Sequence, residues 1–161
     1  MRLIGVVALV STALLLTSGC TVEVGGSVGL TKDAQGRLLA VVVVCHGYID
    51  GLTMYRDDTE NSDAHSNDRG RWMNESPIKR DTTLDLVGPG LGWKTVVPLA
   101  VLTPGQEVRI YGWTNKSRWS ADGPAFQVSD LARLDSEHIL SALSDPNELV
   151  PRAEFRALAC G

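Results

Sequence analysis

The chain has 161 residues, of which 43% are apolar and 21% are charged, and its formal net charge is −4. That length suits one domain, and the apolar content is ordinary for a globular protein that buries a core. The balance is acidic and no long run of one charge occurs, which argues against intrinsic disorder and against a nucleic-acid-binding surface. We expect no cofactor.

The first twenty residues have the pattern of an export signal. Arg2 gives a short basic start, residues 3–16 are an uncharged apolar run of fourteen residues, and small residues precede Cys20. This run suits the hydrophobic region of a signal peptide, because a membrane-spanning helix needs about twenty residues. An ordinary secretory leader with an incidental cysteine is the alternative.

Residues 17–20, Thr-Ser-Gly-Cys, resemble the lipobox of bacterial lipoproteins, although Thr17 stands where leucine is usual. The resemblance implies cleavage after residue 19 and a diacylglycerol on the thiol of Cys20. It also implies that residues 20–161 are held on the extracytoplasmic face of the cell membrane by this lipid.

The number of cysteines agrees with that interpretation. The chain has three cysteines, so one is left over after pairing. If Cys20 carries lipid, then Cys45 and Cys160 remain, and an oxidising compartment would join them in a disulfide.

Alternating and continuous apolar patterns predict short strands through most of the domain. Residues 22–30 alternate with period two, residues 33–36 supply a turn, and residues 38–45 form a Val-rich run that suits a strand buried on both faces. We expect further strands over 52–55, 84–87, 95–99 and 107–114 and around Phe126 and Val128. Strands at such intervals with Gly and Pro turns predict an antiparallel β-sandwich.

Two further patterns refine this fold. Residues 102–105, followed by Val108 and Ile110, resemble the Pro-Gly turn that enters a strand in immunoglobulin-like and fibronectin-like domains, which implies that type of sandwich. After Asp135 and after Pro151 the apolar spacing predicts short helices, one at Ile139, Leu140 and Leu143 and one at Phe155, Leu158 and Ala159.

The whole pattern, from the leader through Cys45-His46-Gly47 to residues 155–160, is similar to uncharacterised lipoproteins of actinobacteria. That resemblance spans most of the chain and implies no particular activity.

Residues 57–81 are the longest polar stretch, and we predict a long loop here as the first place to look for a binding site. Clustered carboxylates could hold Ca²⁺, but the spacing differs from that of an EF-hand loop and nearby arginines would neutralise the charge, so no metal is expected. The candidate binding residues are Asp57, Asp58, Glu60, Asp63, His65 and Asp68.

Other candidate residues are aromatic or nucleophilic. Trp72 and Trp113 could form an aromatic surface for a glycan or a partner protein, or a tryptophan could pack on the disulfide instead. Ser27 lies in a Gly-x-Ser-x-Gly sequence but lacks the strand–turn–helix context of a catalytic serine. The three histidines lie too far apart in sequence for a short-spaced zinc site.

The leading prediction is therefore a lipid-attached binding or envelope-interaction module that is not an enzyme. Its partner would be a glycan or a protein of the cell envelope near the membrane. The alternative is an envelope hydrolase or metal-dependent enzyme that uses the acidic loop at 57–81.

Overall fold

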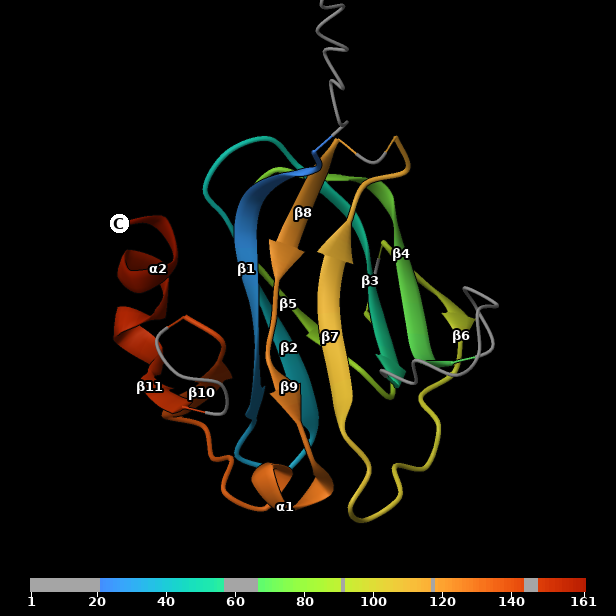
Figure 1. Ribbon diagram of the computed structural model, residues 1–161, viewed down its shortest axis with the longest axis vertical. Coiled ribbons are helices and arrows are strands. Elements are labelled where there is room, and N and C mark those ends of the chain that lie inside the picture. Colours follow the sequence, from blue (N-terminus) through green and yellow to red (C-terminus); the bar gives the residue numbers. More distant parts are fainter. Residues whose placement is uncertain (1–20, 57–66, 91, 117, 144–147) are drawn as a thin grey trace, which may run out of the picture.

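The computed structural model describes residues 21–56, 67–90, 92–116, 118–143 and 148–161. These residues form eleven strands, all joined in one curled sheet, and two helices (Figure 1). The elements in chain order are β1 Glu23–Lys32, β2 Leu38–Val44, β3 Ile49–Arg56, β4 Asp68–Ile78, β5 Thr82–Asp85, β6 Trp93–Val97, β7 Val108–Trp113, β8 Trp119–Asp122, β9 Ala125–Phe126, α1 Val128–Leu131, β10 His138–Ser141, β11 Glu148–Pro151 and α2 Arg152–Cys160.

The sheet branches at β1. One edge of β1 pairs antiparallel with β2, which continues to β5. At the other edge the first half of β1 runs parallel to β8, and Leu30 near its end pairs with Leu140 of β10. From β8 the sheet continues through β7, β3 and β4 to β6, while β10 continues to β11. The prediction of a mainly β domain is confirmed, and the immunoglobulin-like sandwich stays a prediction.

The main core lies inside this curl. In Figure 1, β2 and β5 pass behind β8 and β7, and side chains from both parts belong to one buried cluster. Leu30 of β1, Val42 of β2, Leu52 of β3 and Ile110 of β7 are at most 1% exposed. Each such side chain stabilises the fold by about 1.5–3 kcal/mol relative to an exposed position.

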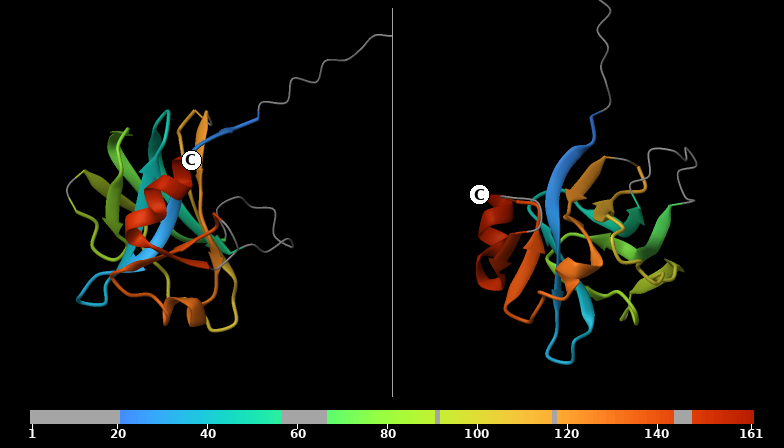
Figure 2. Two further views of the ribbon diagram at one scale, coloured as in Figure 1. Left: turned by 90° about the vertical axis from the view of Figure 1, so that its left-hand side faces the viewer. Right: turned by 60° about the horizontal axis from the view of Figure 1, so that its bottom comes forward.

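The Val-rich strand β2 is buried on both faces, as its continuous apolar run predicts. Ala40, Val42 and Val44 enter the main core, whereas Val43 packs in a second cluster with residues of β10, β11 and α2. In Figure 2 α2 lies across the outer side of β1, so the C-terminal segment covers what would otherwise be a solvent-facing apolar strand. The run therefore needs two layers of neighbours, one on each side.

Gly29 of β1 allows that outer layer to come close. A Cβ atom at Gly29 would lie 2.2 Å from Cγ2 of Ile139 and 3.0 Å from the ring of Phe155. Any larger residue would push β10 and α2 away from β1, because real Cβ atoms do not make contacts this short.

The predicted helix at Ile139, Leu140 and Leu143 is wrong, because residues His138–Ser141 form strand β10. Ile139 enters the second cluster and Leu140 enters the main core, and both are 0% exposed. Neighbouring residues that are buried on opposite sides require the period of a strand. The predicted helix near Phe155 is confirmed as α2, which buries Phe155.

The long polar loop predicted over 57–81 is also wrong in its second half. Residues Asp68–Ile78 form β4, which pairs with β3 on one side and β6 on the other. Its polar residues alternate with buried ones such as Gly70 and Trp72, so half of the strand faces solvent. Residues 57–66, which join β3 to β4, lie outside the described residues.

The disulfide between Cys45 and Cys160 is present, as predicted. It joins the residue after β2 to the end of α2 across 115 positions of sequence, with the two Cα atoms 5.4 Å apart. The bond therefore holds the covering helix against the strand that it buries.

We expect Cys45→Ala with Cys160→Ala to lower the free energy of unfolding by up to about 5 kcal/mol, the loop-closure value for a separation of 115. Urea unfolding of the wild type with and without reductant, beside the double variant, measures this. Equal midpoints for all three samples would contradict a stabilising role for the bond.

The carboxylate of Asp135 accepts hydrogen bonds in the turn that leads into β10, and these bonds lower its pKa. The His138 ring lies 3.0 Å from both carboxylate oxygens, and the backbone N–H groups of Glu137 and His138 also donate to the carboxylate. The hydrogen bond to the His138 side chain, followed by that from Glu137, holds the pKa of Asp135 below its ordinary value of 3.8.

The ionised carboxylate therefore supports the turn fully above pH 3.8, and this support is lost as the pH falls through the lowered pKa. We expect His138→Ala to move the Asp135 midpoint up towards 3.8 in an NMR titration. Asp33 is the control. Desolvation raises the pKa of Asp33, but hydrogen bonds from Arg37 and Gln35 outweigh that effect and lower it. Because none of these partners is His138, the pKa of Asp33 should not change in His138→Ala.

Candidate functional site

The outer face of the β7, β3 and β4 part of the sheet carries aromatic and arginine side chains. On β7, Arg109, Tyr111 and Trp113 alternate with residues that enter the core. The strand register places them beside β3 and β4, with Tyr55 opposite Arg109, Thr53 opposite Tyr111, and Arg71 opposite Thr53. We call this surface the β7–β3–β4 face, defined by Arg109, Tyr111, Trp113, Thr53, Tyr55 and Arg71.

Contacts across the strands hold these side chains in place. The Trp113 ring lies over Gly51, where a Cβ would come within 2.4 Å of it, and its indole N–H donates to Oγ1 of Thr53 at 2.9 Å. The Arg71 guanidinium lies 4.9 Å from the centroid of the same ring, a cation–π distance. The indole is therefore fixed from three sides.

A second aromatic contact lies further along the same face. The rings of Tyr55 and Tyr111 have their centroids 5.5 Å apart with planes at 89°, an edge-to-face arrangement that aromatic pairs prefer. Tyr111 is 38% exposed. Ring surface and a phenol hydroxyl are thus presented to solvent in a fixed orientation.

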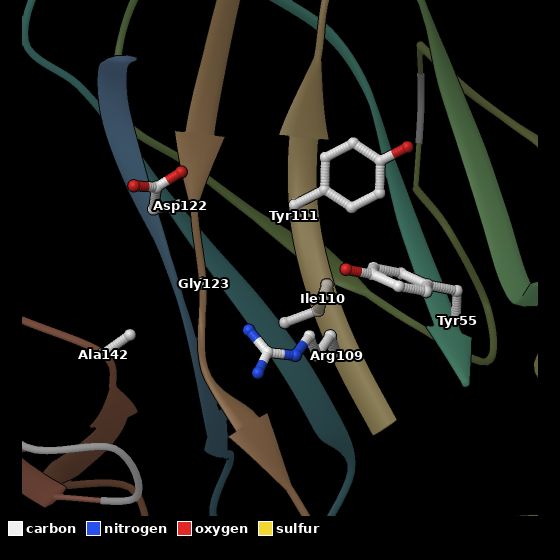
Figure 3. Close-up of a pocket in the computed structure, with 7 residues that line it drawn as sticks. All are labelled: Tyr55, Arg109, Ile110, Tyr111, Asp122, Gly123 and Ala142. Atoms are coloured by element: carbon white, nitrogen blue, oxygen red, sulfur yellow. The ribbon is translucent and has the colours of Figure 1, made fainter. Parts of the chain in front are cut away.

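The tyrosines border an open depression of about 330 Å³ (Figure 3). The Arg109 guanidinium points from β7 towards Gly123, and Asp122 lies on the β8 side of the hollow. Gly123 keeps this wall close, because a Cβ there would lie 2.3 Å from the carbonyl oxygen of Ile110. The hollow therefore combines a cationic donor, an anionic acceptor, phenol groups and flat ring surface.

Such a set of groups suits recognition of a polar ligand that also has an apolar side. Aromatic rings supply stacking area, and a few placed polar groups fix the orientation of what is bound.

The sequence predicts that Trp72 and Trp113 both lie on an aromatic surface. Trp113 lies on the β7–β3–β4 face, but the prediction for Trp72 is wrong. Trp72 is 0% exposed, lies opposite Leu52 of β3, and packs its ring over Gly70. Because residues 68–78 form a strand and not a loop, side chains alternate between the two faces, and Trp72 falls on the inner one.

The residues proposed as an acidic binding loop are only partly placed. Asp57, Asp58, Glu60, Asp63 and His65 lie outside the described residues. Asp68 begins β4, and its side chain is 5% exposed with Oδ2 3.9 Å from the Arg71 guanidinium.

Within the described part of the chain, no three His, Cys, Asp or Glu side chains lie close enough to hold a metal ion. In the same part, no helix has both the length and the apolarity to cross a bilayer.

Ser27 lies in the middle of β1 and is 2% exposed, with its hydroxyl donating to the carbonyl oxygen of Asp122 at 3.1 Å. His46 contacts the ring of Trp119, and His138 contacts Asp135. These three side chains therefore belong to separate local contacts, each with its own partner.

Sequence reasoning missed Tyr55, Arg109 and Tyr111. The alternation of Arg109, Tyr111 and Trp113 with Val108 and Ile110 was a usable signal for an exposed polar and aromatic side of β7. The approach of Tyr55 had no such signal, since it depends on the pairing of β3 with β7.

We expect Thr53→Val to destabilise the protein by about 1 kcal/mol, because the half-buried Trp113 indole loses its acceptor. Urea unfolding followed by fluorescence measures the change. Thr53→Ser keeps the hydroxyl and should stay close to the wild type. A loss in Thr53→Ser without a loss in Thr53→Val would show that packing of the methyl group, and not the hydrogen bond, is what counts.

Comparison of the chain with protein-family models, with curated proteins and with solved structures found no match, so the site is interpreted from its own chemistry.

Proposed function

We propose that this protein is a lipid-attached binding module on the extracytoplasmic face of the cell membrane, and that it binds a glycan of the cell envelope without catalysing a reaction. The observation that carries the proposal is the β7–β3–β4 face, where solvent-facing Tyr111 is held beside Tyr55, Arg109 and Trp113. Localisation and ligand are both part of the proposal.

Attachment is supported by the leader and by the cysteines together. The apolar run at residues 3–16 ends just before Cys20, as in the lipobox sequences that it resembles. Cys45 and Cys160 pair with each other, so Cys20 is left as the odd cysteine. Two acyl chains give a durable anchor, at about 0.8 kcal/mol per buried CH₂.

We further propose an immunoglobulin-like sandwich as the fold type, and the strand neighbours support it. In such domains strands B and E are neighbours in one sheet, and C, F and G are neighbours in the other. Strands β2 and β5 are neighbours, as B and E are, and β3, β7 and β8 are neighbours in that order, as C, F and G are. The chain departs from the pattern in β6, in the β10–β11 hairpin with α2, and in a disulfide that ends in α2.

A glycan suits the β7–β3–β4 face because a sugar ring has an apolar side and a rim of hydroxyl groups. The apolar side can stack on the Tyr111 ring, while hydroxyls accept from Arg109 and donate to Asp122. Aromatic and arginine side chains are also the residues that most often dominate binding energy at interfaces.

The test is binding of the purified chain to a panel of bacterial envelope glycans, followed by calorimetry on the saccharide that binds. Loss of a binding hot spot costs about 2 kcal/mol or more, so Tyr111→Ala should weaken binding by about 30-fold. Near-ultraviolet circular dichroism checks that the variant is folded.

Val101→Ala is the matched control, because Val101 is 94% exposed and lies outside the β7–β3–β4 face. Its affinity should equal that of the wild type. Binding that survives Tyr111→Ala, or a panel without any bound saccharide, would defeat the glycan proposal. Capture of a protein by a photocrosslinker at position 111 would point to the protein-partner version instead.

A further inference from the structure

One end of the sheet gathers a distinctive set of exposed side chains. The chain enters β1 there, and β8 begins there, whereas the turn after β1 and helix α1 lie at the opposite end (Figure 1). We call this end the amino end and define it by Val22, Val24, His46, Lys116, Arg118 and Trp119.

Trp119 is the centre of the amino end. Its ring packs over two glycines, and a Cβ at Gly25 or Gly47 would lie 2.9 or 2.5 Å from it. The His46 ring meets it edge to face, with centroids 5.3 Å apart and planes at 73°. The ring is therefore fixed in position.

The indole N–H of Trp119 remains available for a partner. Among the described residues, none accepts a hydrogen bond from it. The nitrogen is also not one of the buried polar atoms that lack a partner, so solvent can reach it. A half-buried indole with a solvent-facing N–H is the form of tryptophan that lies at membrane–water interfaces.

Apolar and basic side chains surround Trp119. Val22 is 39% exposed and Val24 is 48% exposed, at the start of a strand whose middle is buried. Lys116 and Arg118, in the β7–β8 connection, are also exposed. Carboxylates also lie at this end: Glu23 is 3.9 Å from His46, and Asp50 and Glu75 border the same hollow as Lys116.

The length of the chain before β1 limits where this end can be. Residues 20–23 span at most about 11 Å even when fully extended. If Cys20 is held at the membrane, the start of β1 therefore lies close to the lipid headgroups.

We propose that the amino end docks on the headgroups of an anionic lipid membrane, with Trp119 at the interface and Lys116 and Arg118 facing lipid phosphates. This inference rests on the proposed lipid attachment and adds an orientation to it. Strands β7 and β3 extend, in opposite directions, between the far end and the amino end, so the β7–β3–β4 face points sideways along the membrane and stays open to ligand.

The acidic domain as a whole is repelled by anionic lipid, and this repulsion strengthens the orientation. The basic connection is the part that is drawn to the anionic surface.

The experiment uses the full chain, produced in a bacterial host that processes lipoproteins and reconstituted in phosphatidylglycerol vesicles with or without brominated acyl chains. Bromine quenches tryptophans that contact the lipid. The wild type should be quenched, Trp119→Phe should lose most of that quenching, and Trp113→Phe, which alters the β7–β3–β4 face, should keep it.

A second variant tests the charges without touching the folded interior. Lys116→Gln with Arg118→Gln should lower the docked-to-undocked ratio about fivefold per charge on anionic vesicles, seen as reduced quenching, with little change on phosphatidylcholine. If Trp119→Phe fails to fold, this double variant decides the matter, since both side chains are exposed.

The outcomes separate this inference from the proposed function. A chain that fails to attach to vesicles overturns the lipid attachment and the docking together. A chain that attaches but is quenched equally in the wild type and in Trp119→Phe overturns the docking alone, as does a double variant that docks like the wild type. Glycan binding through Tyr111 is tested separately, by the calorimetry with Tyr111→Ala.

Discussion

The double burial of β2 is the constraint on which the rest of the structure depends. A strand with valines at four successive positions presents apolar side chains to both sides, and one sheet layer can cover only one side. The curl of the sheet covers one side, while β10, β11 and α2 cover the other. Gly29 allows this outer layer to approach, and the disulfide from Cys45 to Cys160 holds it there.

With the core closed in this way, the outer side of β7, β3 and β4 needs no further cover. Its large aromatic side chains are kept in place by one another and by Arg71 and Thr53, not by burial under another layer. Rings that are fixed before a ligand arrives lose little conformational freedom on binding, which is why such a surface suits recognition.

The two ends of the strands differ in chemistry, and this difference relates the proposed binding face to the proposed anchor. Tryptophan, valine and basic side chains gather where the chain enters β1, and carboxylate-bound turns close the opposite end. Because β3 and β7 run between these ends, attachment at one end leaves the face between them open to the side.

Local sequence patterns determined the strands between residues 22 and 55, the strand near 107–114 and the C-terminal helix, since period and turn residues act over short range. The cysteine pair followed from the resemblance of residues 17–20 to a lipobox, which sets Cys20 aside. Local patterns did not determine the sidedness of Trp72, the strand at Ile139 and Leu140, or the partners of Tyr111. Ile139 and Leu140 are compatible with a helix until two separate clusters bury them from opposite sides. Tyr55 and Arg109 become neighbours only through the register of β3 with β7, which the packing of the whole sheet decides.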